Sequence, residues 1–260
     1  MKNIGDGTKQ SSNDFTLFIS DLHLCASRPH ITTEFLDFLK TTASQARALY
    51  ILGDLFEYWA GDDDVDDAHT QSIITGLRVL SESGVSTYFM RGNRDFLLGE
   101  IFCNATKISL LQDPTLIDLY GNRVLLSHGD VLCTDDKAYQ AFRQQVRGPA
   151  WQKGFLMQPL HARKQQIENI RLRSEQEKSQ KSAQIMDVNQ PSVEEFLMRF
   201  DYPELLIHGH THRPKTHSLV IDQHNITRWV LGDWYEQGSY LVCDKLGCNM
   251  IPLAVSGSSL

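Results

Sequence analysis

The sequence predicts an α/β fold, because short apolar runs alternate with amphipathic segments and several of these runs end in loops rich in His, Asp and Gly. Five such runs are FTLFIS (15–20), ALYIL (48–52), STYFM (86–90), VLLS (124–127) and LLI (205–207). Short runs with β-branched and aromatic residues, bounded by turn residues, are typical of strands. Open α/β sheets deliver functional side chains from the carboxyl ends of their strands, so we expect the five loops to share one crevice.

Apolar stripes with a helical period lie between the first strands, which predicts helices there. The stripes are formed by Ile31, Phe35, Phe38 and Leu39, and by Ile73, Leu77 and Leu80. From Thr216 onward the pattern changes to strand-like runs separated by turn residues, which predicts an antiparallel meander.

Residues 137–200 interrupt this pattern with helical segments only. Gly148-Pro149, Gly154 and Pro159 divide the stretch, and Ser192-x-x-Glu195 is a capping box for a last helix. A helical insertion between two strands that carry site residues predicts a cap over the site. Without repeats or a linker, we expect a flexible extension over residues 1–14 and a single domain over 15–260, with the cap at about 137–200.

The composition, 41% apolar and 22% charged over 260 residues, is that of a globular protein. The first residues lack the apolar core of a signal peptide, and no run reaches the roughly 18 apolar residues that span a bilayer. We therefore expect the protein to stay in the cytoplasm. Five scattered cysteines without a C-x-x-C motif predict reduced, mostly buried thiols.

Charge is unevenly distributed along the chain. Between Lys137 and Lys181 there are ten basic and three acidic residues, a net +7. The whole chain carries −7, so the remainder carries −14. A basic block in an acidic protein favours an anionic ligand or a membrane surface over general affinity for nucleic acid. The alternative is a solvated helical face.

The loops after the five runs carry a constellation of polar residues. Its members are Asp21-x-His23, Gly53-Asp54, Gly92-Asn93-Arg94-Asp95, His128-Gly129-Asp130 and Gly209-His210-Thr211-His212. Two imidazoles spaced i, i+2 at the end of a strand point the same way and can bind metal. Alone, such a pair can equally be ordinary loop residues. Five motifs in this order, each after an expected strand, predict a metal site.

The order of these motifs resembles the calcineurin-like metallophosphoesterase superfamily, whose pattern is DxH, GD, GN[HR]D, GH and GHxH. The match runs from about Phe15 to Cys243 and implies a four-layer αββα sandwich with two metal ions. By resemblance, Asp21, His23 and His212 hold one metal, Asn93, His128 and His210 hold the other, and Asp54 bridges them. Nitrogen and oxygen ligands without thiolate suit Mn²⁺, Fe or Co, with Zn²⁺ also possible. His208 precedes the match and is interpreted as a strand residue that supports the site.

Arg94 narrows the expected chemistry. The metals would lower the pKa of a bridging water and supply hydroxide for in-line attack on phosphorus. Many superfamily members have His at the position of Arg94, where it is thought to protonate an alkoxide leaving group. Arginine cannot act as an acid near neutral pH, whereas a phosphate leaving group needs no proton. We therefore expect cleavage of a diphosphate, with Arg94 binding phosphate oxygens; the alternative is a structural ion pair with Asp95.

Longer strings resemble the UDP-2,3-diacylglucosamine hydrolase family, the lipid A pathway pyrophosphatases. They are ILGDLFEYWAGDDD (51–64), RGNRDFLLG (91–99), LSHGDVLCTDDKAYQAFR (126–143), KSAQIMDVN (181–189) and HGHTHRP (208–214). The resemblance implies two Mn²⁺ per chain, water attack on the α-phosphorus of UDP-2,3-diacylglucosamine, and peripheral association with the cytoplasmic face of the inner membrane. It implies no nucleic-acid partner and no obligatory protein partner.

The resemblance also assigns individual residues. The catalytic set is Asp54, Asn93, Arg94, His128 and His210, and the substrate contacts are Asn93, Arg94, Asp136, Ser174, Lys178, Lys181 and His210. Ser174, Lys178 and Lys181 have i, i+4, i+7 spacing, so a helix would present them on one stripe toward the site. Tyr139 and Arg171 are plausible neighbours.

Three further features of the chain bear on the expected function. The apolar residues Tyr139, Phe142, Val146, Trp151, Phe155, Leu156, Met157 and Leu160 suit either acyl chains or packing of the cap. Basic residues Arg143, Arg147, Lys153, Arg163 and Lys164 are expected to rest on anionic lipid. The acidic loop Asp62–Asp67 is interpreted as a solvated loop that caps the next helix, rather than as a third cation site.

Two other functions fit parts of the same pattern. One is a different metallophosphoesterase activity, such as hydrolysis of dinucleoside polyphosphates or of phosphodiesters. The other is a non-catalytic scaffold that uses a degenerate phosphoesterase fold to bind proteins. The intact residues at all seven ligand positions argue against this scaffold.

Overall fold

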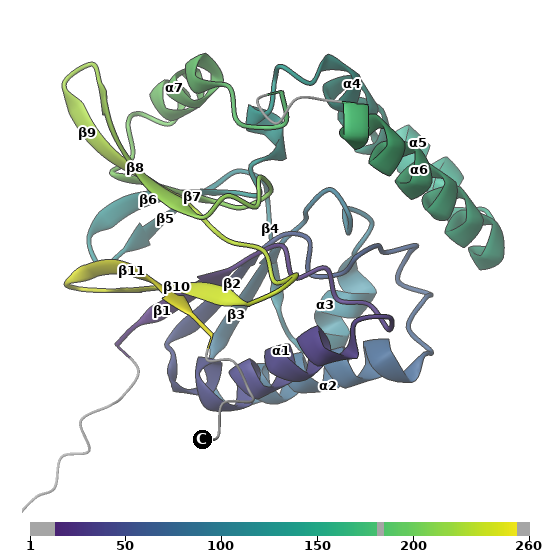
Figure 1. Ribbon diagram of the computed structural model, residues 1–260. Coiled ribbons are helices and arrows are strands. Elements are labelled where there is room, and N and C mark those ends of the chain that lie inside the picture. Colours follow the sequence, from purple (N-terminus) through teal and green to yellow (C-terminus); the bar gives the residue numbers. More distant parts are fainter. Residues whose placement is uncertain (1–13, 181–184, 254–260) are drawn as a thin grey trace, which may run out of the picture.

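The computed structural model describes residues 14–180 and 185–253, and it contains two facing sheets with helices on their outer sides (Figure 1). The six-stranded sheet has the order β11-β10-β1-β2-β3-β4, and the five-stranded sheet has the order β5-β6-β7-β9-β8. The strands of the first sheet are β1 Thr16–Ile19, β2 Ala48–Leu52, β3 Ser86–Met90, β4 Ser109–Leu111, β10 Ser239–Asp244 and β11 Gly247–Pro252. Those of the second are β5 Thr115–Leu119, β6 Asn122–Ser127, β7 Leu205–His208, β8 Lys215–Ile221 and β9 His224–Val230.

The α-helices lie on two sides of the molecule. Below the six-stranded sheet lie α1 Pro29–Thr41, α2 Ala68–Glu82 and α3 Glu100–Thr106, and on the other side of the molecule lie α4 Lys137–Val146, α5 Pro149–Leu156, α6 Leu160–Gln180 and α7 Gln190–Arg199 (Figure 1). Two short 3-10 helices are η1 Ala43–Gln45 and η2 Asp130–Leu132. Within the described ranges, no helix is both long and apolar enough to cross a bilayer.

Three apolar clusters show how the layers are held together. Leu17 and Ile19 of β1 pack toward the helices below, whereas Phe18 between them packs into the space between the two sheets. In the second sheet Leu126 faces that same space and Leu125 faces α7. Successive side chains of a strand point to opposite faces, so strands covered on both sides read as continuous apolar runs. The four-layer αββα prediction is therefore confirmed.

The predicted local elements of the N-terminal half are also confirmed. The stripe of α1 is buried, as is that of α2. Asp67 ends the acidic loop as the N-cap of α2, where its side chain accepts a hydrogen bond from the Thr70 amide at 2.9 Å. The sequence patterns did not predict β4 or β5, which are short and only partly buried.

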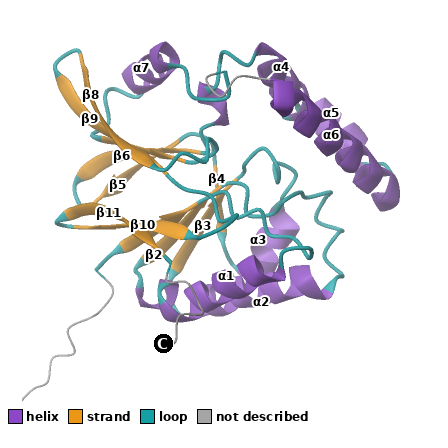
Figure 2. Cartoon of the chain, in the orientation of Figure 1, coloured by secondary structure: helices purple, strands orange, loops and turns teal. Residues whose placement is uncertain are grey.

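The described residues between η2 and β7 are helical apart from short connections, as expected (Figure 2). However, α7 packs on the five-stranded sheet, because Val193, Phe196 and Leu197 join its apolar cluster. The helices beside the loops at the strand ends are therefore α4, α5 and α6, and the division of residues 15–260 into a body and a cap stays a prediction. The expected capping box was wrong: Asn189, not Ser192, is the N-cap of α7 and accepts from the Ser192 amide at 3.0 Å.

Two predictions for the C-terminal part were wrong. The strands from Thr216 onward form two hairpins in different sheets, because β8 and β9 pair in the five-stranded sheet and β10 and β11 pair in the other. The second hairpin also places Cys243 opposite Cys248, and these two cysteines form a disulfide instead of remaining reduced. The other three thiols are free, and two of them are buried as expected.

The expected N-terminal extension falls almost entirely on residues 1–13, which lie outside the described residues. Its last residue, Asp14, accepts from Lys245 Nζ at 2.9 Å.

Candidate active site

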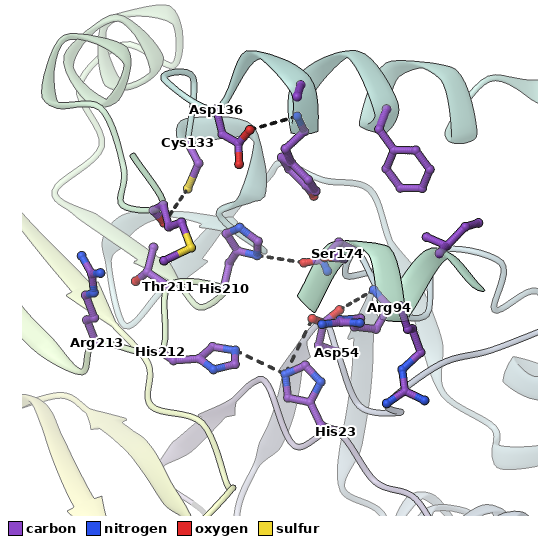
Figure 3. A pocket seen from close by; sticks show the side chains of 17 residues that line it. His23, Asp54, Arg94, Cys133, Asp136, Ser174, His210, Thr211, His212 and Arg213 are labelled. Atoms are coloured by element: carbon purple, nitrogen blue, oxygen red, sulfur yellow. Dashed lines mark hydrogen bonds and ion pairs between the residues drawn. The ribbon is translucent and has the colours of Figure 1, made fainter. Parts of the chain in front are cut away.

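The carboxyl ends of β1, β2, β3, β6 and β7 meet at one edge of the two sheets, and each loop contributes candidate ligands. Figure 3 shows the imidazole rings of His23, His210 and His212 close to Asp54. Five of the seven predicted ligands have a left-handed backbone: Asp21, His23, Asp54, His210 and His212, with φ between 50° and 69°. This conformation is uncommon for residues other than glycine, and it concentrates at functional sites, where the surrounding structure enforces it.

The first group of candidate ligands is Asp21, His23 and His212. The Nε2 atoms of the two histidines lie 3.3 Å apart, and Asp21 Oδ1 lies 3.3 Å from Nε2 of His212 and 4.0 Å from Nε2 of His23. Asp21 Oδ1 is buried and has no hydrogen-bond partner, while Oδ2 accepts from Ser20 Oγ and the His210 amide. An unsatisfied buried carboxylate oxygen beside two imidazole nitrogens fits a cation.

The second predicted group is Asn93, His128 and His210. Asn93 Oδ1 lies 2.9 Å from His128 Nε2 and 2.8 Å from His210 Nδ1. Asp54 lies between the two groups, since Oδ2 is 3.8 Å from His23 Nε2 and Oδ1 is 3.8 Å from His128 Nε2. Among the described His, Cys, Asp and Glu residues, two clusters could hold a metal: Asp21 with His23 and His212, and Asp21 with Asp54 and His128. The structure brings all seven predicted residues together.

Contacts behind the ligands orient their rings. His128 Nδ1 donates to the Leu52 carbonyl at 2.9 Å, and His212 Nδ1 lies 3.3 Å from Asp233 Oδ2. With the proton on Nδ1, the lone pair of Nε2 points into the site, which is the tautomer that a metal ligand needs. Asp95 fixes the surrounding backbone by accepting from four amides, those of Asp54, Leu55, Phe56 and Gly92.

The motifs need glycine because the backbone at these positions lies too close to the ligand side chains to leave room for a Cβ atom. A Cβ at Gly92 would lie 2.1 Å from Asp54 Oδ1, and one at Gly209 would lie 2.2 Å from Asp21 Oδ2. Real Cβ atoms do not approach other atoms so closely. In the G-N, G-D and G-H motifs, the second residue is a candidate ligand, and the glycine before it leaves room for the side chain of another site residue.

Electrostatics at the site favour a cation. Burial raises the pKa of Asp54 to about 7, with His128 opposing the rise and the carboxylates of Asp95 and Asp21 adding to it. Three buried carboxylates in one place repel each other, and a divalent cation between them relieves that repulsion. The donor set, its geometry and its charge thus fit divalent metal.

His208 is separate from the metal ligands, as interpreted from the sequence. It is fully buried in β7, donates from Nδ1 to the Gly209 carbonyl at 2.9 Å and accepts at Nε2 from Arg228 at 3.0 Å. Acceptance from a guanidinium requires a neutral ring. Burial, together with Arg228, lowers the pKa of His208 to about 4.

A cavity of about 490 Å³ opens above these loops. Three kinds of residue line it: the metal-site residues His23, Asp54, Asn93, His210 and His212, the polar residues Arg94, Asp136, Tyr139, Arg171, Ser174, Thr211 and Arg213, and the less polar residues Cys133, Ala138, Phe142, Ile170 and Met186. Figure 3 shows Asp136 on the far side of the cavity from Asp54. Among the predicted substrate contacts, Lys178 lies in α6 with an undescribed side chain, and Lys181 lies outside the described residues.

Four of the basic residues that were expected to rest on lipid face protein carboxylates, and their contact with lipid stays a prediction. Arg143 Nε and Arg147 Nη2 lie 2.8 and 3.2 Å from Asp130 Oδ2. The last two bind the acidic loop: Arg163 pairs with Asp63, and Lys164 Nζ lies 2.5 Å from Asp64 Oδ1. The acidic loop is therefore more than a solvated cap, and it joins α6 to the body. Lys153 is exposed, as expected.

Several residues at the site lie outside the five metal-site motifs. Glu57 lies 3.9 Å from Arg94 through Oε1 and Nη1, so Arg94 pairs with Glu57 rather than with Asp95. Tyr235 stacks on His23 with ring centroids 5.0 Å apart. Asp233 and Tyr235 come from the loop after β9, about 20 residues beyond the last motif. Their only sequence signal is the turn-like stretch GDWYEQG (232–238).

Comparison with known proteins agrees with this geometry. Residues 16–214 match the family model described as Calcineurin-like phosphoesterase. Solved structures resemble the chain more distantly: an archaeal phosphodiesterase is 11% identical with a TM-score of 0.48, covering 92% of this chain and 99% of that chain. The chain is a metal-dependent hydrolase of the calcineurin-like phosphoesterase class.

Within that class, curated relatives match over most of their length. A UDP-2,3-diacylglucosamine hydrolase of Aromatoleum aromaticum is 53% identical over 231 residues, which is 89% of this chain and 94% of the relative. Proteins of the same name from Xanthomonas axonopodis pv. citri and Escherichia coli are 49% and 50% identical, covering 92% and 86% of this chain and 99% and 92% of their own. The chain belongs to the UDP-2,3-diacylglucosamine hydrolase family.

Proposed function

We propose that the protein hydrolyses the diphosphate of UDP-2,3-diacylglucosamine to UMP and 2,3-diacylglucosamine 1-phosphate, with water attacking the α-phosphorus. The names of the relatives support this substrate. The observation that carries the proposal is that candidate metal ligands, three arginines and an apolar wall line the same cavity of about 490 Å³. A nucleotide-sugar lipid presents the matching three parts: a diphosphate, polar rings and acyl chains.

Two Mn²⁺ ions per chain are part of this proposal. Asp21, His23 and His212 would hold one, Asn93, His128 and His210 would hold the other, and Asp54 would contact both. When bound, such ions supply an activated water and stabilise negative charge on phosphate oxygens. The mixed His, Asp and Asn set suits Mn²⁺ better than Mg²⁺, which prefers oxygen ligands.

The chain's own residues bind and orient the diphosphate. Arg94 and Arg171 line the cavity, and a guanidinium binds phosphate oxygens through a planar pair of N–H groups. Neither can donate a proton near pH 7, which a phosphate leaving group does not require. Asn93 and His210, which are hydrogen-bonded to each other, also face the cavity. These residues favour cleavage of a diphosphate over cleavage of an ester with an alkoxide leaving group.

The glucosamine and acyl parts would lie under α4 and α6. Asp136 and Ser174 supply polar groups, with Lys178 and Lys181 as further proposed contacts from the end of α6 and beyond. The Tyr139 ring stacks on His210 at 5.8 Å between centroids and closes one side of the cavity. Phe142, Ile170 and Met186 form the apolar wall, where each buried CH₂ of an acyl chain contributes about 0.8 kcal/mol.

Peripheral association with the cytoplasmic face of the inner membrane completes the proposal, because the substrate is a lipid. Leu156 and Met157 at the end of α5 are 42% and 78% exposed, and Lys153 lies one turn away. Exposed apolar side chains beside a cation suit the surface of an anionic bilayer. No nucleic-acid partner and no obligatory protein partner is proposed.

Hydrolysis in ¹⁸O-labelled water tests substrate and regiochemistry together. With Mn²⁺ present, we expect UDP-2,3-diacylglucosamine to be cleaved and the label to appear in UMP, because attack at the α-phosphorus breaks its bond to the bridging oxygen. Label in the sugar phosphate would contradict attack at that atom. Faster cleavage of bis-nucleoside polyphosphates or of a phosphodiester under the same conditions would contradict the substrate.

A further inference from the structure

Glu57, in the loop after β2, places one buried carboxylate among three arginines and a histidine. Its Oε2 lies 2.7 Å from Arg28 Nη2 and 3.6 Å from His23 Nδ1. Its Oε1 lies 3.2 Å from Arg171 Nη2 and 3.9 Å from Arg94 Nη1. The two oxygens therefore face different parts of the site: Oε2 faces a predicted metal ligand, and Oε1 faces Arg94 and Arg171, two of the arginines that line the cavity.

The groups around Glu57 come from three separate segments, because His23 and Arg28 share the loop between β1 and α1. His23 follows β1, Arg28 precedes α1, Arg94 follows β3 and Arg171 lies in α6. Glu57 is only 7% exposed, so its charge acts where water screens poorly. Three guanidinium groups around one carboxylate leave a net positive charge, and the two that line the cavity point this charge at an anionic substrate.

His23 needs a carboxylate partner at this position. A histidine that binds metal through Nε2 is normally oriented by an acceptor at Nδ1. Nδ1 of His23 is buried without a hydrogen-bond partner, and Glu57 Oε2 is the carboxylate oxygen nearest to it among the described ion pairs. Arg28 Nη2 bridges the same two residues by donating to the His23 carbonyl at 2.6 Å and to Oε2.

We propose that Glu57 is a positioning residue that couples the two halves of the site: it orients His23 through Oε2, and it aims Arg94 and Arg171 at the substrate diphosphate through Oε1. This inference rests on the proposed function. It explains why a buried acid lies next to an anionic substrate, a position where a carboxylate would otherwise weaken binding.

Glu57→Gln and Glu168→Gln form a matched pair for the test, because both carboxylates contact Arg171. Glu168 Oε2 lies 3.1 Å from Arg171 Nη1, but the side chain is 55% exposed. E57Q should raise KM for UDP-2,3-diacylglucosamine roughly tenfold or more, as expected for loss of a buried charged contact. It should also raise the Kd for Mn²⁺, measured by calorimetry without substrate, by about tenfold. E168Q should change neither value by more than about twofold, in keeping with the small value of exposed ion pairs.

Arg171→Gln tests the Oε1 half while Glu57 stays in contact with His23 and Arg28. R171Q should raise KM and leave the Kd for Mn²⁺ unchanged. In the E57Q/R171Q double variant, the rise in KM should be smaller than the product of the two single rises, because both changes remove the interaction between Glu57 and Arg171. Effects on KM that multiply in the double variant would overturn the proposal, as would an E57Q protein that matches E168Q. If E57Q does not fold, an unchanged KM in R171Q would likewise overturn the proposal.

Failure of the proposed function gives a different pattern. In that case the unsubstituted protein would not cleave UDP-2,3-diacylglucosamine, yet E57Q would still weaken Mn²⁺ binding relative to E168Q. Normal cleavage by the unsubstituted protein with equal Mn²⁺ affinities in E57Q and E168Q would overturn the role of Glu57 alone.

Discussion

The Nε2 atoms of His23 and His212 face each other at 3.3 Å, although the two residues are 189 positions apart in the sequence. Each ring has a carboxylate near Nδ1, Glu57 for His23 and Asp233 for His212, which favours the Nδ1–H tautomer. Two lone pairs would then point at each other. A cation bound by both nitrogens would replace this repulsion with attraction. Asp21 Oδ1, which lies beside them without a hydrogen-bond partner, supplies a negative charge to the cation.

Asp54→Ala should abolish turnover, because the two carboxylate oxygens of Asp54 each lie 3.8 Å from a histidine of a different predicted group, His23 and His128. Metal contributes several kcal/mol of charge stabilisation, and about 1.4 kcal/mol corresponds to a tenfold change in rate. We therefore expect kcat to fall by roughly a thousandfold or more. Asp37→Asn, on the exposed face of α1, is the control and should retain full kcat. Substantial activity in D54A with bound Mn²⁺ would contradict the bridging role.

Lys181→Ala should mainly weaken substrate binding. Lys181 is a proposed contact of the sugar phosphate and is not a metal ligand, so KM should rise while kcat stays within about threefold. Steady-state kinetics beside D54A checks this difference. Similar, small effects of both substitutions would count against the assignment of roles.

Asp130→Asn should lower the free energy of unfolding by about 3 kcal/mol, because it leaves two partly buried guanidinium groups without their buried carboxylate. Asp130 is fully buried and binds Arg143, Arg147 and the Tyr139 hydroxyl. Asp201→Asn is the matched control, since the Asp201 side chain in its pair with Arg123 is 86% exposed and should contribute less than about 1 kcal/mol. If urea unfolding gave the same loss of unfolding free energy for D130N and D201N, burial of Asp130 with its arginines would add nothing to stability.

His208 should make the fold less stable in mild acid. Its pKa is lowered to about 4 by burial and Arg228, whereas an unfolded histidine titrates near 6.5. The unfolded state therefore binds the proton first as the pH falls below about 6.5, and stability is lost down to about pH 4. At pH 5 this costs about 2 kcal/mol relative to neutral pH. His208→Gln should remove that part of the pH dependence in metal-free unfolding experiments, and an unchanged slope would contradict the neutral ring.

The strands and their loops could be predicted because their signals are local. An apolar run followed by Gly53-Asp54 or Gly209-His210 encodes both the strand and the side chains at its carboxyl end. The left-handed φ of Asp54 and His210 agrees with that reading, since each follows a glycine that leaves room for the turn.

The remainder depends on contacts between distant segments. Glu57 and Asp233 lie outside the five metal-site motifs. Their roles depend on the arginine and histidine side chains that the fold places beside them. Cys243 and Cys248 pair because of the hairpin register, which the strand pattern does not fix. Ser192 and Asn189 are both good N-caps, and the chain uses Asn189 because Pro191 then occupies the first turn of α7.

Anomalous diffraction from crystals soaked in Mn²⁺, recorded near the manganese edge, tests the metal centre most directly. The account predicts two peaks per chain, one among Asp21, His23 and His212 and one among Asn93, His128 and His210, with Asp54 within ligand distance of both. A crystal in which Mn²⁺ occupies other positions while these seven side chains coordinate none would contradict it.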